Sequence, residues 1–173
     1  NSEDTRKLYE RITEYLSELF ASGGLTEDQA TQTAGIMYIL SDVDRMSALC
    51  REVCLSLKDK EEKKYKYSKD AMRDMQHSLH LIQEMFTKAV QMMVSGNTDA
   101  AKDILKQKEK ILDLGIKMRK SHVERVGEGK CKAKLTEPYN RIIHHIDRMG
   151  NCCINIVDAV QGKMGESYLE TVA

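Results

Sequence analysis

Several kinds of residue are scarce in this chain, and each scarcity excludes a class of structure or function. With one proline, no tryptophan and 5% aromatic residues among 173, few strand-forming residues lie between the turn signals. A fold built on a sheet therefore lacks candidate strands. Glycine-rich phosphate loops, nucleophile elbows and a Ser/His/Asp order are also missing from the sequence. We expect a protein without strands that is not an enzyme.

Net charge and long apolar runs are absent as well. The chain carries 27 Lys and Arg against 27 Asp and Glu, whereas nucleic-acid-binding proteins usually have a basic excess that neutralises phosphates. We therefore expect no nucleic-acid partner. No apolar stretch of membrane-spanning length and no signal peptide occurs. Five cysteines at spacings unlike a disulfide framework favour a reducing, cytosolic compartment. Because the sequence begins at Asn1 and not at Met, we expect a soluble fragment of a longer protein.

Apolar residues recur at alternating spacings of three and four along most of the chain. Five such segments are separated by turn signals. These signals are Gly23-Gly24, the capping box Thr26-x-x-Gln29, Ser95-Gly96-Asn97 and Gly127-Glu128-Gly129, and a charged stretch lies between the second and third segments. Sustained spacing of this kind is typical of long helices packed nearly parallel or antiparallel. The predicted fold is an all-α antiparallel bundle of five long helices.

The second and fifth segments repeat each other after a shift of 103 residues. Ile39-Leu40-x-x-Val43-Asp44-Arg45-Met46-x-x-x-Cys50 overlays Ile142-Ile143-x-x-Ile146-Asp147-Arg148-Met149-x-x-x-Cys153. We divide the chain into an incomplete first repeat of two helices, residues 1–64, a complete second repeat of three helices, residues 65–162, and a tail, residues 163–173. Two helices alone bury their apolar seams poorly. We therefore expect an apolar face of the first repeat to be covered by the second repeat or by another chain.

The repeated phrase resembles a known signature. Asp147–Val157 is similar to the stretch on the last helix of each three-helix repeat in PhoU-like proteins, and Ser121–Val126 with Gly129–Cys131 is similar to a phrase of cotransporter-linked PhoU-like domains. The resemblance covers nearly the whole chain in order, and it implies a PhoU-like bundle. The signature residues that it implies, in structural or regulatory roles, are Asp44, Arg45, Asp147, Arg148, Asn151 and Asn155.

The resemblance implies regulation and not chemistry. It points to the C-terminal cytosolic domain of a bacterial sodium/phosphate cotransporter family protein that modulates phosphate uptake through helix contacts. Its partner would be a transmembrane transport domain upstream in the full-length chain. Its location would be the cytoplasmic side of the bacterial inner membrane. A homodimer is left open.

A metal-binding carboxylate bundle, holding iron or zinc, is the alternative function. In metal-binding PhoU proteins two acids four residues apart help to hold the metals. Here the first acid is present as Asp44 and Asp147, but Ala48 and Asn151 replace the second. Alanine cannot ligate a metal, so no cofactor is expected.

Ligands for such a metal site would have to come from elsewhere in the chain. The candidates are Asp44, Asp147 and the pair Glu109 and Asp113 one turn apart, supplemented by Asp42 or His144-His145. We favour a structural role in which Asp44 and Asp147 each bond to an Arg or Lys on a neighbouring helix or fix the register between helices.

Overall fold

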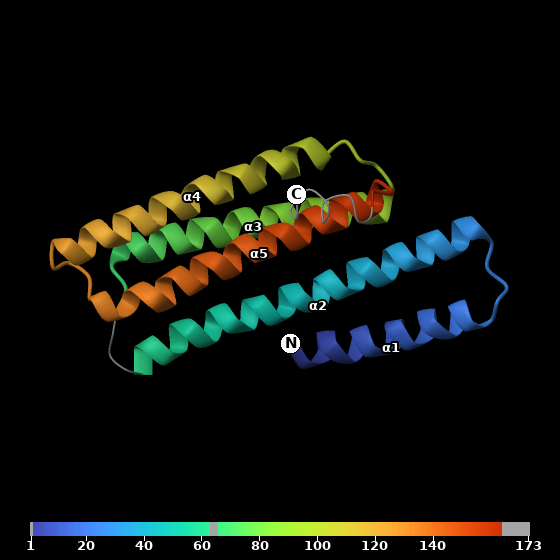
Figure 1. The fold of residues 1–173 in the computed structure, drawn as a ribbon, viewed down its shortest axis with the longest axis horizontal. Coiled ribbons are helices and arrows are strands. Elements are labelled where there is room, and N and C mark those ends of the chain that lie inside the picture. The colour runs from blue at the N-terminus through green and yellow to red at the C-terminus, as the bar shows by residue number, and fades with distance from the viewer. Residues whose placement is uncertain (1, 63–65, 164–173) are drawn as a thin grey trace, which may run out of the picture.

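Five α-helices account for most of the residues that the computed structural model describes, which are 2–62 and 66–163, and no strand occurs among these residues. Figure 1 shows the helices lying lengthwise beside one another in an antiparallel bundle. They are α1 (Ser2–Ala21), α2 (Glu27–Glu62), α3 (Lys69–Ser95), α4 (Ala101–Gly127) and α5 (Thr136–Val160), with a 3-10 turn at Ala133–Leu135 before α5. The predicted all-α helical bundle is confirmed. Most of the tail, residues 164–173, lies outside the described residues.

Local hydrogen bonds explain where the helices begin and end. The Thr26 N–H donates to Gln29 Oε1 (2.9 Å) and the Gln29 N–H donates to Thr26 Oγ1 (3.3 Å), which is the reciprocal pattern of a capping box. At the start of α3, the Ala71 N–H donates to Ser68 Oγ (3.2 Å). Gly96 ends α3 in the left-handed region (φ 69°), a conformation that costs glycine little. The turn chemistry read from the sequence therefore operates in the fold.

One continuous core lies between α3, α4, α5 and the inner face of α2. Its large buried side chains are Met75, Met85 and Met92 of α3, Ile104, Ile111 and Met118 of α4, Tyr139, Ile142, Met149 and Ile156 of α5, and Ile39, Met46, Leu49 and Val53 of α2. The stripe of α3 that carries these three methionines thus packs inside the molecule. Burying side chains of this size stabilises the bundle by about 1.5–3 kcal/mol each before the entropy of ordering is subtracted.

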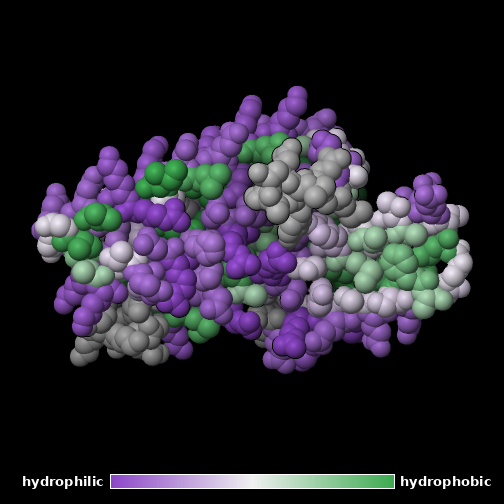
Figure 2. Space-filling view, viewed as in Figure 1, coloured by the Kyte–Doolittle hydropathy of each residue, from purple (hydrophilic) through white to green (hydrophobic). Residues whose placement is uncertain are grey.

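The first repeat is covered less completely than the second. Helix α1 packs mainly against α2 at the edge of the bundle (Figure 1). Its seam residues Leu8 and Tyr15 are 58% and 64% exposed, while the residues 103 positions later, Ile111 and Met118, are 3% and 1% exposed. Figure 2 shows a pale apolar area on the part of the α1–α2 hairpin that extends beyond the other helices. The second repeat covers only the inner face of α2.

The same difference separates α2 from its repeat, α5. Cys50 and Cys54 are exposed on α2, whereas their equivalents Cys153 and Val157 are buried on α5. Because the sequence pattern is shared, the cause lies in the neighbours. Helix α5 packs extensively against α2, α3 and α4, whereas the extensive contacts of α2 are with α1 and α5 alone among the described helices.

Candidate functional site

The signature residues lie on α2 and α5, which run antiparallel and make the most extensive helix–helix contact among the described residues (Figure 1). Asp42 of α2 and Asn155 of α5 form the central polar contact of this interface. Asn155 Nδ2 donates to Asp42 Oδ1 at 3.2 Å, and both residues are buried. A hydrogen bond between two helices inside an apolar core favours one register over others. We take this contact as the centre of the candidate site.

Asp42 is a buried carboxylate with several neighbours. Its side chain is 4% exposed, and Arg45 Nη1 lies 3.9 Å from Oδ1. Burial first, and the nearby Asp42 carboxylate second, raise the pKa of the Cys152 thiol to about 12, so this thiol stays protonated and can donate to Asp42. An amide, a guanidinium and a thiol together offset part of the cost of burying the charge.

The two ends of the α2–α5 contact are related by the internal repeat. The residues 103 positions away from Asp42 and Asn155 are His145 and Glu52. In the structure the Glu52 carboxylate raises the pKa of His145, although burial, the largest effect, lowers it, with His144 adding to the lowering. Neither ring nitrogen of His145 has a hydrogen-bond partner among the described residues. At one end of the α2–α5 contact Asp42 and Asn155 therefore form a hydrogen bond, and at the other end Glu52 lies near His145.

Asp147 joins α5 to α4. Its carboxylate pairs with Lys108 Nζ, which also donates to the Asp147 carbonyl oxygen at 3.2 Å. The Lys108 side chain is only 12% exposed. Gly150 makes room for it, since a Cβ at this position would lie 2.9 Å from Lys108 Cδ. This contact is the expected bond from Asp147 to a basic side chain on a neighbouring helix.

The other predicted site residues are more scattered. Asp44 is half-buried and lines a polar hollow between α1 and α2 with Arg6 and Arg51. Arg45 is exposed but reaches towards Asp42. The remaining signature and metal candidates are exposed on α4 and α5; they are Arg148, Asn151, Glu109 and Asp113.

The structure does not gather the metal candidates into a centre. Within residues 2–62 and 66–163, no three His, Cys, Asp or Glu side chains come together in a group that could hold a metal ion. Asp147 faces Lys108, a cation that competes with any metal for the carboxylate. Iron or zinc binding by Asp44, Asp147, Glu109 and Asp113 stays a prediction that no contact in the described residues supports.

From the sequence alone, Asp42 is a candidate only as a supplementary metal ligand, whereas the structure places it at the centre of the α2–α5 contact. A signal was present in the sequence. Asp42 falls three residues after Ile39 and four before Met46, which places it on the inner stripe of α2 that faces α5.

Ser121–Val126 and Gly129–Cys131, which resemble a phrase of cotransporter-linked domains, form the end of α4 and the loop that leads to α5. His122 is 1% exposed, and its Nε2 lies 3.0 Å from Thr136 Oγ1 at the start of α5. Its ring stacks on Tyr139 with 4.8 Å between centroids, and Cys131 Sγ lies 3.8 Å from Nδ1. Burial lowers the pKa of His122, so the neutral imidazole is favoured in the folded protein. These residues have a packing role in the structure.

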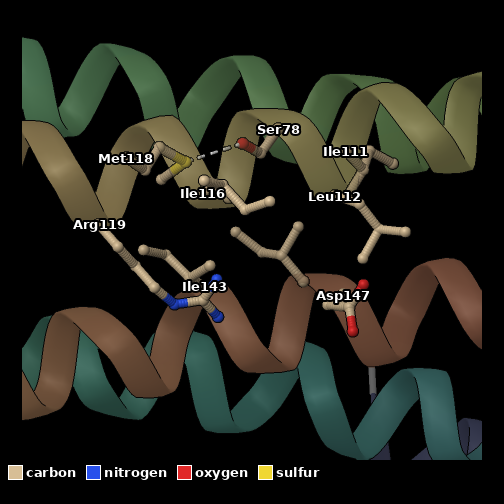
Figure 3. A pocket seen from close by; sticks show the side chains of 10 residues that line it. Ser78, Ile111, Leu112, Ile116, Met118, Arg119, Ile143 and Asp147 are labelled. Atoms are coloured by element: carbon tan, nitrogen blue, oxygen red, sulfur yellow. Dashed lines mark hydrogen bonds between the residues drawn. The ribbon is translucent and has the colours of Figure 1, made fainter.

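A small pocket opens between α4 and α5 near the Lys108–Asp147 pair. Figure 3 shows Ile116 and Ile143 beside it, with Arg119 reaching from α4 towards α5. It holds about 90 Å³, well below the roughly 300–1,000 Å³ of typical ligand sites. Gly115 forms part of its wall, where a Cβ would lie 3.1 Å from Ile143 Cγ2. The pocket is too small for an organic substrate.

Comparison with known proteins gives one match, which covers part of the chain. Residues 75–160, which span most of α3, all of α4 and α5 and their connections, match the family model of the PhoU domain. Comparisons with curated proteins and with solved structures gave no significant match. No helix in the described part of the chain is long and apolar enough to cross a membrane. PhoU domains are associated with the regulation of phosphate transport and form a regulatory, non-enzymatic family. Residues 75–160 of this chain are a PhoU domain.

Proposed function

We propose that the chain is a non-catalytic regulatory domain on the cytosolic side of a sodium-dependent phosphate transporter. In this proposal a transmembrane transport domain precedes it in the full-length protein and is its main partner. The observation that supports the proposal is the PhoU match over α3–α5, a family associated with phosphate-transport regulation. The resemblance of residues 121–131 to a phrase of cotransporter-linked domains supports the more specific context.

The use of the signature in this chain favours regulation through contacts. Asp42–Asn155 joins α2 to α5, and Lys108–Asp147 joins α4 to α5. These polar side chains are used between helices, so a signal that enters the domain acts on helix packing. The first repeat leaves the seam of α1 exposed on the surface, which gives a partner an apolar face to contact.

Deletion of the domain from the full-length protein in its natural host tests the proposal. We expect sodium-dependent uptake of radiolabelled phosphate to change, or to lose its response to phosphate supply, when residues 1–173 are removed. If uptake and its response both stay the same while the truncated protein reaches the membrane in equal amount, the proposal fails.

Two point variants separate loss of the folded domain from a general effect of mutation. Ile142 is fully buried in the core, so Ile142→Asp should unfold the domain and reproduce the deletion phenotype. Gln76 is exposed on α3, so Gln76→Asp should leave regulation unchanged. Immunoblots of membrane fractions check that each full-length variant is present at the same level.

A further inference from the structure

Helix α4 carries a second apolar stripe on its outward flank. Leu105 and Leu112 are each 47% exposed, and Ile116 and Val123 are each 64% exposed. Figure 2 shows apolar patches among hydrophilic side chains along the upper part of the view, where Figure 1 places α4. The core-facing residues of α4, such as Ile111 and Met118, belong to a different stripe and are buried. Half-exposed aliphatic side chains aligned along one helix indicate a contact surface.

Two charged residues complete the pattern of this stripe. With Glu109 and Arg119 included, the positions 105, 109, 112, 116, 119 and 123 advance by alternating steps of four and three. This spacing is that of a two-helix coiled-coil seam, and it extends over roughly 27 Å at 1.5 Å per residue. Glu109 and Arg119 are both exposed. In the single chain Arg119 leans towards the small pocket beside Gly115, so its pairing with a second copy requires the flexible side chain to turn outward. The stripe, which we call the outer α4 seam, thus has four aliphatic positions, one acid and one base.

The outer α4 seam is complementary to itself when reversed. In an isologous pair of antiparallel helices, each residue faces the residue equally far beyond the twofold axis. An axis beside Leu114 places Leu105 opposite Val123 of the second copy and Leu112 opposite Ile116 of the second copy. The same axis places Glu109 opposite Arg119 of the second copy. All six layers match, four by apolar contact and two by opposite charge.

A parallel pairing does not match in this way. It would place Glu109 against Glu109 and Arg119 against Arg119, and like charges facing each other within a seam are unfavourable. The small pocket between α4 and α5 adds a further feature, because Leu112 and Ile116 of the seam also line it. A second helix lying along the seam covers the mouth of this pocket.

We propose that the outer α4 seam is a dimerisation surface, on which the α4 helix of a second copy of this chain packs in antiparallel orientation. Four aliphatic side chains from each copy supply the apolar burial. The two Glu109–Arg119 pairs select the antiparallel register over the parallel one. This dimer goes beyond the proposed function and does not depend on it.

Sedimentation equilibrium of residues 1–173 tests the proposal directly. Because the interface is one helix wide, we expect a reversible dimer with a dissociation constant on the order of micromolar. The weight-average mass should rise from that of a monomer towards twice that value between low and several hundred micromolar protein. A monomer over the whole range overturns the proposal.

Charge-reversal variants test the orientation. Glu109→Arg alone places Arg opposite Arg, and Arg119→Glu alone places Glu opposite Glu, so each should raise the dissociation constant at least tenfold. The double variant Glu109→Arg/Arg119→Glu restores opposite charges in both layers and should return the constant close to the starting value. A double variant that dimerises no better than the single variants contradicts the antiparallel seam. Both residues are exposed, and circular dichroism checks that the helices stay folded.

A matched pair of apolar variants tests the location. Ile116→Glu should abolish dimerisation, because it places a charge opposite Leu112 of the second copy. Leu55 is 52% exposed on α2, away from the seam, and Leu55→Glu should leave the dissociation constant within about twofold of the starting value. Equal loss of dimer in both variants, or retention in both, contradicts the assignment to α4.

Discussion

Polar side chains buried between helices decide how α2 and α5 fit together at the scale of single residues. Asp42 is 3% exposed and Asn155 is 9% exposed, and each supplies a partner that the other needs inside the core. Leaving a buried polar group without its partner costs more than the bond itself contributes, typically about 1–3 kcal/mol. Of the two signature asparagines, the buried Asn155 should therefore contribute more to stability than the exposed Asn151.

Asn155→Ala should lower the free energy of unfolding by about 1–3 kcal/mol, because the Asp42 carboxylate loses its amide donor. Asn151 lies one turn earlier on α5 and is exposed, so Asn151→Ala should change the free energy of unfolding by less than about 0.5 kcal/mol. Urea unfolding followed by circular dichroism measures both. Equal effects would show that the hydrogen bond to Asp42 is not what makes Asn155 important.

Acid should weaken the fold through His122 and His145. Burial lowers the pKa of both imidazoles below the ordinary value of 6.5, so the unfolded chain binds protons that the folded chain resists. The stability that each contributes is present above pH 6.5 and is lost as the pH falls further. Below pH 6.5 each histidine can lower the free energy of unfolding by at most about 1.4 kcal/mol for each pH unit.

Urea unfolding at pH 7.5, 6.5 and 5.5 checks this dependence. His122→Gln removes one of the two groups and should flatten the loss of stability below pH 6.5. His77→Gln, at an exposed position of α3, should leave the slope as it is. A slope that His122→Gln does not alter would show that other groups carry the acid sensitivity.

The five thiols should react in two classes. Burial raises the pKa of Cys152 and Cys153 to about 12, and Cys131 is 8% exposed, so these three should resist a disulfide reagent in the reduced native protein. Cys50 and Cys54 are exposed and should react. Cys50 should react more slowly, because partial burial of its thiol and the neighbouring Cys54 raise its pKa.

Titration with Ellman's reagent should count two thiols in the native state and five in denaturant. The variant Cys50→Ser/Cys54→Ser should show none in the native state. Rapid reaction of a third thiol in the wild type would contradict the burial of Cys131, Cys152 and Cys153.

At the scale of the element, small residues on α4 and α5 set how closely the two helices approach. Gly115 faces Ile143, and Gly150 faces the stem of Lys108. The glycines act by leaving room, which allows a lysine to cross from α4 and pair with Asp147. A helix interior that tolerates the cost of glycine usually gains a close contact in return.

Gly150→Ala should lower the free energy of unfolding, because the new Cβ would lie 2.9 Å from Lys108 Cδ and displace a side chain that pairs with Asp147. The higher helix propensity of alanine, about 1 kcal/mol, offsets part of this loss. Gly127, at the end of α4, has no atom within 4 Å of an added Cβ, so Gly127→Ala should be neutral or stabilising by up to about 1 kcal/mol. Thermal or urea unfolding distinguishes the two signs, and equal signs would contradict a steric role for Gly150.

Helix boundaries were predictable because they depend on neighbouring residues in the chain. The capping box at Thr26 and the glycine at 96 act within one turn, and the repeat fixes which helices are alike. The rotation of α2 was not predictable, because two stripes of this helix are apolar and only packing on α5 selects the one containing Asp42. The pairing of Lys108 with Asp147 depends on the register between α4 and α5, which no local pattern contains.

At the scale of the whole molecule, three helices that pack closely on one another lie beside a less covered pair. Helices α3, α4 and α5 bury one another, whereas α1 rests mainly on α2. We expect local opening to begin with α1, since its exposed seam contributes few buried contacts. Contact with a partner through this face would then stabilise the part of the domain that opens most easily.

Helices α2 and α5 are copies of one repeat that run antiparallel, so the two ends of their contact carry equivalent positions. The two halves of a symmetric dimer interface are related in the same way. A symmetric dimer of separate chains must carry every substitution twice, once in each half. Here both halves belong to one polypeptide, so each end can change alone. One end carries an acid with an amide, Asp42 and Asn155, and the other carries a histidine with an acid, His145 and Glu52. Joining the halves in one chain thus frees one end to change while the other keeps the helices in register.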